Sequence, residues 1–262
     1  MTTTHYVIPS YQRAEIVRDK SLPQLNRLGV GNKETTVFVA SEEEERTYKG
    51  ALPDDVTIVV GELGIGRQRK FINKYFPEGD RIVSVDDDVE LVQKNDNKVK
   101  PLELPLPELA RRAFSLCEET GTRFWGTVTS SNGFFQRHQV VHGLRDCTGG
   151  LFGEYAQETD CHSSLDSCED SEKILLHYVK YGGILRLDDV CGKNRYYSDG
   201  GVNAYYEGKE NRLKDYLRNL GLLVDKFPDL VSIKTQNLDK PEKGLTKIKL
   251  KTVTRLPSIL NQ

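Results

Sequence analysis

Three consecutive carboxylates follow a short apolar run in the first third of the chain. Residues 82–85 read Ile-Val-Ser-Val, which is typical of a buried strand, and the run ends at Asp86, Asp87 and Asp88. Unpaired carboxylates are costly to bury and neighbouring ones repel each other, so this cluster favours a divalent cation. Alternate side chains of an extended segment point the same way, which puts Asp86 and Asp88 on one face. Two oxygen donors side by side suit Mg²⁺ or Mn²⁺, although a solvated acidic turn is the simpler alternative.

A glycine-rich loop leads into a basic helix shortly before this cluster. The loop spans residues 61–66, and the helix after it begins with Arg67, Arg69 and Lys70. The N–H groups at a helix N-terminus, reinforced by cations, form a natural anion site. The spacing is neither that of a P-loop nor the full dinucleotide fingerprint. A flexible loop followed by a solvated basic helix stays the alternative.

The first predicted strand ends in a third group of polar side chains. Pro9 ends that strand, and the residues that face the strand end after it are Ser10, Tyr11 and Arg13. A tyrosine can stack on a base, and an arginine can hold a diphosphate through two hydrogen bonds. An ordinary strand-to-helix turn would have the same composition.

Two segments in the second half of the chain also carry usable groups. Glu169 and Asp170 stand at the start of a predicted helix, where a carboxylate can deprotonate an incoming hydroxyl or simply cap the helix. Tyr196 and Tyr197 lie just before a Gly-Gly pair, which is typical of a loop that closes over a ligand or of a surface hairpin turn. Among five histidines with no metal-type spacing, His142 is the one of interest, because it lies near the Gly149-Gly150 turn.

The bulk composition excludes some classes of protein. The 262 residues include 37 basic and 39 acidic side chains, so the net charge of −2 excludes whole-surface attraction to nucleic acid but not a local basic groove. No apolar run is long enough to span a membrane, and the N-terminus lacks the pattern of a secretory signal. An odd number of cysteines, five, indicates reduced thiols. We therefore expect a cytoplasmic protein, with no membrane contact and no obligate protein partner. A zinc site is an alternative that no Cys-x₂-Cys pair supports; its ligands would be Cys147, Cys161, His162 and Cys168.

Strands alternate with helices through the first 90 residues. Apolar runs predict strands at residues 6–9, 35–40, 56–60 and 81–85, and the predicted helices between them are 14–28 (broken or kinked at Pro23), 42–48 and 66–75. This alternation indicates a parallel sheet with crossover connections. Ligands of such sheets bind beyond the carboxyl ends of the strands, where the polar groups above would meet.

The rest of the chain is predicted in less detail. We expect a surface excursion at 95–107, helices at 108–121 and 171–181, strands at 124–130, 140–144 and 184–187, and an irregular stretch at 154–168. The tail from Pro228 onward is basic. Its cations alternate, so most of them would share one strand face, either as a basic groove or as edge protection; they are Lys243, Lys247, Lys249, Lys251 and Arg255.

Taken in order, the segments 8–13, 66–70, 86–88 and 169–170 resemble the motifs of a GT-A glycosyltransferase over about residues 5–200. Residues 64–69 followed by 85–88 look most like the TET-associated glycosyltransferases. These are largely bacteriophage enzymes, thought to attach sugars to 5-hydroxymethylpyrimidines in DNA. The resemblance implies an α/β fold of GT-A (Rossmann-like) type: a mixed, mainly parallel sheet flanked by helices. It implies a catalytic domain at residues 1–205, and a C-terminal helix and basic strand extension at 206–262 packed on the same domain on the acceptor side.

The resemblance also implies roles for named residues. Asp86 and Asp88 would hold Mn²⁺ or Mg²⁺, with Asp87 on the ribose or sugar. The UDP-sugar would contact Pro9, Ser10, Tyr11, Arg13, Gly66, Arg67, Lys70, Asp86 and Asp87. In an inverting enzyme Asp170 would be the base, and in a retaining one Glu169 and Asp170 would position the substrates. Many GT-A enzymes add a histidine near the C-terminus, but none follows His177 here, so Asp199, Asn203 or phosphate and water would complete the shell.

A DNA acceptor requires further groups, because a base inside a duplex must be flipped out or met in a single strand. A basic groove would use the tail lysines with Arg137, Lys193 and Arg195, and an aromatic wedge would come from Trp125, Phe134, Phe135, Tyr196 or Tyr197, with His142 on the acceptor side. Three alternatives stay open. They are a glycosyltransferase with a glycan, protein or small-molecule acceptor, a sugar-nucleotide pyrophosphorylase (whose N-terminal glycine signature is missing), and an inactive DNA-binding module with a relic nucleotide-sugar site.

Overall fold

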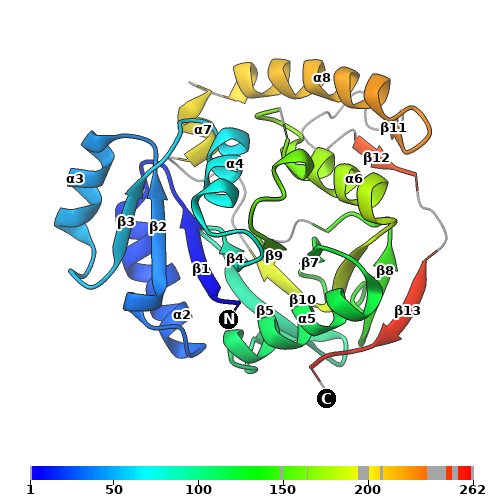
Figure 1. The fold of residues 1–262 in the computed structure, drawn as a ribbon, viewed down its shortest axis with the longest axis horizontal. Helices are drawn as coiled ribbons and strands as arrows, with labels where there is room; N and C mark the ends of the chain where they lie inside the picture. The colour runs from blue at the N-terminus through cyan, green and yellow to red at the C-terminus, as the bar shows by residue number, and fades with distance from the viewer. Residues whose placement is uncertain are drawn as a thin grey trace.

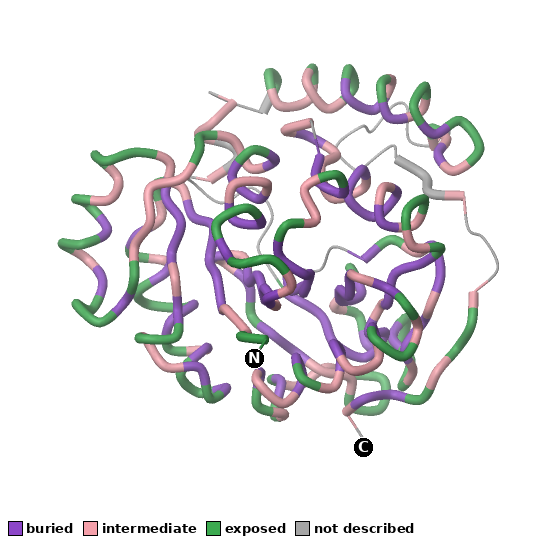
Figure 2. The backbone as a smooth tube through the Cα atoms, viewed as in Figure 1, coloured by how far each residue is buried: buried purple, intermediate pink, exposed green. Residues whose placement is uncertain are grey.

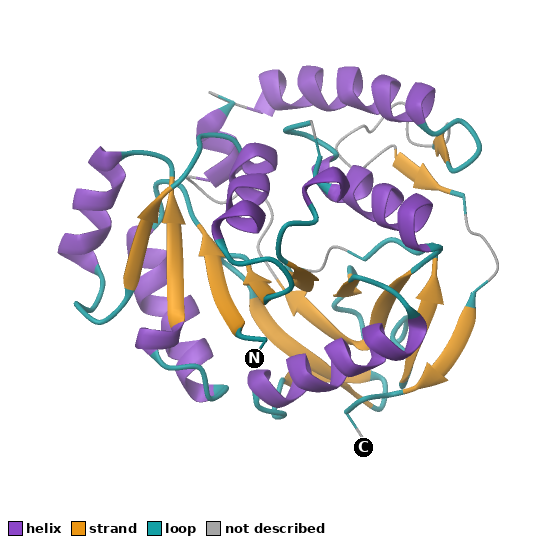
Figure 3. Cartoon of the chain, viewed as in Figure 1, coloured by secondary structure: helices purple, strands orange, loops and turns teal. Residues whose placement is uncertain are grey.

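A computed structural model shows a mixed sheet covered by helices on both faces (Figures 1 and 3). The structure describes residues 2–147, 150–163, 165–193, 201–206, 209–234, 246–249 and 253–260. Eleven strands form the main sheet in the order β13-β8-β10-β7-β9-β4-β1-β2-β3, with β5 paired to β10 and β6 paired to β5. No helix of the described ranges is both long and apolar enough to cross a membrane.

The first half of the sheet is parallel, as the alternation of strands and helices predicts. Pairings of β4 with β1, β1 with β2 and β2 with β3 are all parallel. These strands are β1 (Thr4–Pro9), β2 (Thr35–Val39), β3 (Thr57–Val60) and β4 (Arg81–Val85). The helical segments of this half are α1 (Ala14–Ile16), η1 (Val17–Ser21), α2 (Leu22–Arg27), η2 (Asn32–Glu34), α3 (Glu42–Ala51) and α4 (Ile65–Tyr75).

The helical stretch after β1 contains the irregularity expected at Pro23. Segment η1 is a π-helical turn, and Pro23 follows it in the first turn of α2. Proline has no N–H to donate and its ring crowds the preceding turn, so a wider turn just before it relieves both problems. The helical stretch therefore continues past Pro23, with a π-helical hydrogen-bond pattern in the turn before it.

The second half of the sheet contains strands of both directions. β7 and β10 run parallel to each other, while β9 lies antiparallel between β4 and β7, and β8 is antiparallel to β10. The predicted architecture, a mixed sheet with most strands in one direction and helices on its faces, is confirmed. These elements are α5 (Leu106–Thr120), β7 (Phe124–Val128), β8 (Gln139–Gly143), β9 (Leu151–Tyr155), η3 (Thr159–Cys161), α6 (Glu169–Tyr181) and β10 (Ile184–Lys193). The C-terminal elements are α7 (Gly201–Tyr205), α8 (Lys209–Lys226), β11 (Val231–Ile233), β12 (Thr246–Ile248) and β13 (Thr254–Pro257).

The segment 95–107 lies mostly at the surface, as predicted, and it begins with a hairpin of β5 (Glu90–Asn95) and β6 (Lys98–Pro101), whose turn uses Asp96 at φ +52°. Two local predictions are wrong. Residues 151–155, expected to be partly irregular, form the fully buried strand β9. The basic tail is not one strand, because β12 pairs with β11 in a separate sheet and β13 pairs with β8. Lys243 and Lys251 lie outside the described residues, and the division at residue 205 stays a prediction.

The central strands are mostly buried (Figure 2), and their alternate side chains supply two apolar layers, one on each face of the sheet. Tyr6 and Val83 pack with α2 and α5 in the larger layer. Val7 and Ile82 pack with α4 on the other face, where α6 and α8 cover a further cluster around Phe124 and Phe152. All five cysteines are free thiols, as predicted. The sheet is therefore buried on both faces.

Candidate active site

The three aspartates lie at the carboxyl end of β4, next to the end of β1. The backbone N–H of Asp86 donates to the carbonyl oxygen of Gly150 at 2.9 Å, which ties the acidic loop to the start of β9. The side chains of Asp86, Asp87 and Asp88 are 30%, 8% and 15% exposed. Carboxylates buried this far need partners, and two arginines provide them.

Arg13 links the acidic loop to the loop that follows β1. Its Nη1 donates to Asp87 Oδ1 at 2.9 Å and to Asp88 Oδ2 at 3.0 Å. Ser10 Oγ donates to the other oxygen of Asp87 at 2.6 Å and lies 2.7 Å from the hydroxyl of Tyr48. Burial outweighs these partners and raises the pKa of Asp87 to about 6. Each oxygen of Asp87 thus accepts a hydrogen bond that holds the β1 loop, and its contact with the ribose or sugar stays a prediction.

Arg69 joins the acidic loop to the start of α6. Its side chain is 7% exposed, and Nη2 donates to Asp86 Oδ1 at 3.1 Å. Nη1 donates to Glu169 Oε1 at 2.9 Å and to Asp170. Burial alone would lower the pKa of Arg69, but the three carboxylates outweigh burial and raise it. The sequence identifies Arg69 as one of three helix cations, but only the structure shows that it is the one turned inward.

Glu169 and Asp170 are the first two residues of α6, which begins two residues before the predicted start at 171, and they face the acidic loop through Arg69. Their side chains are 12% and 36% exposed. Burial, followed by the charge of Asp170, raises the pKa of Glu169 to about 8. Asp170 is the more accessible carboxylate of the two.

The acidic loop has free donor atoms of the kind that a hard cation binds. Oδ2 of Asp86 and Oδ1 of Asp88 make no hydrogen bond within the described residues, while the other oxygen of each holds an arginine. Carboxylate oxygens are the donors that Mg²⁺ and Mn²⁺ prefer. Within the same residues no three His, Cys, Asp or Glu side chains lie close enough together to hold a metal ion. The alternative zinc site at Cys147, Cys161, His162 and Cys168 is therefore not formed. Asp199 and the side chain of Asn203 lie outside the part of the chain that the structure describes. The site fits a cation held by two carboxylates and completed by ligand or water oxygens.

The glycine-rich loop brings the N-terminus of α4 against the segment before α6. Gly64 has φ +98°, and a Cβ on Gly66 would lie 2.3 Å from the carbonyl oxygen of Leu165. Gln68, buried on α4, accepts from the N–H of Glu62 at 2.7 Å and donates to Val39 at 3.1 Å. Glycine at position 66 is thus required for close packing, which places Arg69 between the two acidic groups.

The other predicted donor-binding residues surround this arrangement. Arg67 is 55% exposed and donates to the hydroxyl of Tyr205 at 3.2 Å. Lys70 is half-buried and makes no hydrogen bond or ion pair within the described ranges. Pro9 is buried, and the carbonyl oxygen of Tyr11 accepts from the N–H of Gly201 at 2.9 Å, so α7 returns to the end of β1. Arg67 and Lys70 are the cations still accessible to a phosphate.

The predicted acceptor residues are mostly not brought together with this site. Trp125 is fully buried in an edge-to-face contact with Phe114, so it cannot be a wedge. The structure buries it because β9 pairs with its strand and Gly153, directly opposite, leaves room for the indole ring. His142 lies on β8, with β10, β7 and β9 between it and β4, a separation of about 20 Å at ordinary strand spacing. Arg195, Tyr196 and Tyr197 lie outside the described residues.

Comparison with known proteins finds similarity at the level of structure. No protein-family model and no curated protein matches the sequence. A mycobacterial protein of solved structure shares 12% identity, with 99% of this chain and 88% of that one covered at a TM-score of 0.50. Glucosyl-3-phosphoglycerate synthase from Mycobacterium tuberculosis, crystallised with Mn²⁺ and UDP-glucose, gives 11% identity, coverage of 99% and 91%, and a TM-score of 0.48. The mannosyltransferase PcManGT from Pyrobaculum calidifontis, crystallised with GDP-mannose and Mn²⁺, gives 11% identity, a TM-score of 0.47 and coverage of 85%, and this chain spans only 64% of its length. At such identities the likeness concerns the fold alone.

Proposed function

We propose that this protein is a metal-dependent glycosyltransferase that moves a sugar from a UDP-sugar to 5-hydroxymethylpyrimidine bases in DNA. One observation carries the proposal. Asp86 and Asp88 each keep one carboxylate oxygen free at a strand end, while Arg69 connects Asp86 to Glu169 and Asp170. A cation-binding pair and an acidic pair held a few ångströms apart are what a transfer from a nucleotide sugar to a hydroxyl requires.

Each group of residues has its own role in the proposed reaction. Asp86 and Asp88 hold the cation, which when bound would neutralise charge on the leaving diphosphate. Arg67 and Lys70 approach the same phosphates from the N-terminus of α4, where the backbone also favours anions. Asp170, the more exposed carboxylate, accepts the proton of the acceptor hydroxyl in an inverting reaction, and Glu169 orients the acceptor.

The proposal that DNA is the acceptor rests on the sequence motifs. Residues 64–69 and 85–88 look most like those of the TET-associated enzymes, and the structure brings both segments to one strand end through Arg69 and Asp86. These motifs favour a hydroxymethylated base over a glycan, protein or small molecule.

A transfer assay tests both halves of the proposal. A panel of UDP-sugars with Mn²⁺ is offered to DNA that contains 5-hydroxymethylcytosine, 5-hydroxymethyluracil or neither, followed by mass spectrometry of the nucleosides. We expect a sugar mass only on hydroxymethylated DNA, and a loss of at least about 100-fold in Asp88→Ala, because transition-state charge loses its counter-ion. The matched control is Asp55→Ala, an exposed aspartate in the loop before β3, which should keep the wild-type rate.

The other outcomes separate the two claims. Release of UDP without a modified nucleoside would keep the glycosyltransferase and discard DNA as the acceptor. No turnover of any donor would contradict the enzyme itself. Direct Mn²⁺ binding to the wild type and to Asp88→Ala, measured by calorimetry, reports on the cation site independently of turnover.

A further inference from the structure

The loop between β7 and β8 presents two adjacent aromatic rings to solvent. Phe134 and Phe135 are 61% and 64% exposed. Their ring centroids lie 5.3 Å apart in an edge-to-face arrangement. Large apolar side chains exposed together are unusual on a soluble surface, and they commonly mark a binding site.

This loop is held in place by its own hydrogen bonds. Gln136 is fully buried and donates to the carbonyl oxygen of Ser130 at 2.9 Å. Asn132 Oδ1 accepts from the N–H of Phe134 at 3.0 Å, and Arg137 donates to the carbonyl oxygen of Phe134 at 2.7 Å. The fold therefore displays the two rings from an ordered loop, and a ligand would pay little ordering entropy to use them.

Cations from the β5–β6 hairpin lie directly beside the loop. Lys94 Nζ donates to the carbonyl oxygen of Gly133 at 2.7 Å. A Cβ on Gly133 would lie 2.5 Å from the carbonyl oxygen of Lys98, so the loop rests on the hairpin turn. Lys98 and Arg137 are exposed, and Asp96 is the acidic residue of the turn. The aromatic pair is thus flanked by more positive than negative charge.

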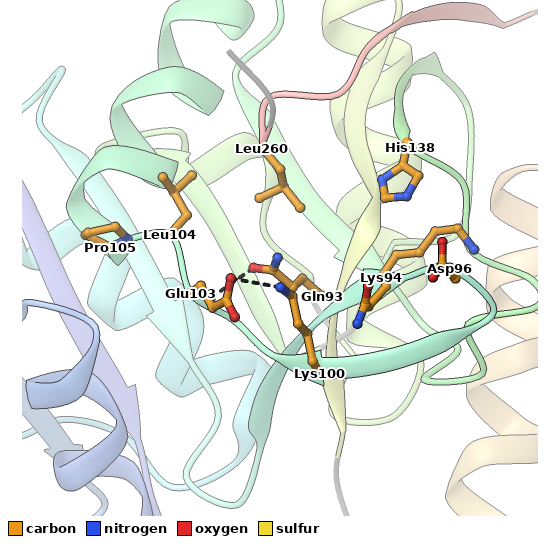
Figure 4. Close-up of a pocket in the computed structure, with 10 residues that line it drawn as sticks. Gln93, Lys94, Asp96, Lys100, Glu103, Leu104, Pro105, His138 and Leu260 are labelled. Carbon is orange, nitrogen blue, oxygen red and sulfur yellow. Dashed lines mark hydrogen bonds and ion pairs between the residues drawn. The ribbon is translucent and has the colours of Figure 1, made fainter.

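A hollow of about 540 Å³ continues from this hairpin (Figure 4). One end is polar, with Lys94, Asp96 and His138, and the other is apolar, with Leu104 and Leu260. The volume lies in the range of ordinary ligand pockets, and the mixed lining suits a group that is part ring and part charge.

The loop leaves the same edge of the sheet as the acidic cluster. β7 runs in the direction of β4, because both are antiparallel to β9 between them. The hydroxyl of Thr127 donates to the carbonyl oxygen of Leu151, and Leu151 pairs with Val85. The last residues of β7 and β4 therefore lie at the same height along the sheet. A chain lying across Phe134 and Phe135 would reach toward the strand ends that carry Asp86.

We propose that the surface formed by Phe134, Phe135, Lys94, Lys98 and Arg137 binds single-stranded nucleic acid. Bases stack on the two rings, and the flanking cations lie against the phosphates, a combination that is tolerant of sequence. The inference deepens the proposed function and rests on its acceptor, since a hydroxymethylated base must leave the duplex to be modified.

The test measures binding of a fluorescein-labelled oligothymidylate by anisotropy, with the full chain and without donor. The double variant Phe134→Ala/Phe135→Ala should bind at least about tenfold more weakly than the wild type, since each stacked base is lost. The matched control is Leu222→Ala/Ile233→Ala, which removes two exposed apolar side chains (51% and 42%) elsewhere and should stay within about twofold. Lys98→Ala should reduce the slope of log affinity against log salt by about 0.7. Circular dichroism checks that each variant is folded.

Three results would overturn the inference: no binding by the wild type, equal affinity of Phe134→Ala/Phe135→Ala, or ring-dependent binding to phosphatidylserine vesicles in place of the oligonucleotide. Release of UDP from a UDP-sugar with Mn²⁺ separates this inference from the proposed enzyme. Release of UDP without ring-dependent oligonucleotide binding would contradict only the proposed binding surface. Ring-dependent binding without release of UDP would contradict only the proposed glycosyltransferase activity.

Discussion

A single guanidinium pairs with three carboxylates at the centre of the candidate site. Arg69 is buried between Asp86 on one side and Glu169 and Asp170 on the other. Three carboxylates this close would repel one another without it. Arg69 therefore keeps the acidic groups near each other in the absence of a cation.

Removing that guanidinium should be costly. Arg69→Ala leaves three partly buried carboxylates unpaired, and we expect it to lower the free energy of unfolding by about 3 kcal/mol. Urea denaturation measures the loss. The control is Arg67→Ala, two residues earlier on the same helix. Arg67 is 55% exposed, so this variant should change the free energy of unfolding by less than about 0.5 kcal/mol.

Millimolar Mn²⁺ should restore part of the stability of Arg69→Ala, because a cation can take the place of the lost charge. Equal stability of Arg69→Ala and Arg67→Ala would show that the carboxylates do not depend on the buried arginine.

At the scale of elements, the site depends on how closely α4 approaches the segment before α6. Gly66 in the first turn of α4 faces the carbonyl oxygen of Leu165, where a side chain has no room. The contact sets the depth at which Arg69 enters the site, one turn along the same helix.

A methyl group at this contact should separate the two elements. Gly66→Ala puts a Cβ 2.3 Å from a backbone oxygen, and we expect it to destabilise the fold by about 1–3 kcal/mol and to lower transfer activity. The control is Gly50→Ala in α3, where a Cβ meets nothing within 4 Å, and which should be neutral or stabilising by up to about 1 kcal/mol. Thermal and urea unfolding check both, and a neutral Gly66→Ala would contradict the close approach.

At the scale of the whole molecule, the second face of the sheet buries ionisable groups under α6. His177 is fully buried against Phe124. Burial lowers the pKa of His177 to about 3, and the charges of Lys173 and His162 act in the same direction, while Glu154 opposes them. The folded protein therefore holds His177 neutral throughout the mildly acidic range.

This burial predicts acid sensitivity with a definite sign. Between pH 6.5 and pH 3 the unfolded chain binds a proton at His177 and the folded chain does not, so stability falls as the pH falls. At pH 5 the loss is about 2 kcal/mol relative to pH 7, since each pKa unit is worth about 1.4 kcal/mol. His177→Leu should remove that part of the pH dependence, measured by urea denaturation at the two pH values. Parallel pH profiles of wild type and variant would contradict the assignment.

Local patterns in the sequence were sufficient for several features. Apolar runs ending in polar groups located the first four strands, and Asp86–Asp88, Arg13 and Gly66 were found at the ends where a parallel sheet collects its ligands. The helix start at Ser41 also followed from its own residues, because capping and charge act within one turn, whereas α6 begins two residues before the predicted start at 171.

Only the tertiary structure decided which of these side chains face each other. Arg69 and Arg67 are two residues apart on one helix, yet one is buried among carboxylates and the other is exposed, because α6 and the acidic loop pack on a single side of α4. Trp125 is similarly buried because β9 pairs with its strand, and β9 itself was obscured by the glycine and glutamate within its run. Burial depends on partners far away in the sequence, so it is set by packing that no local pattern records.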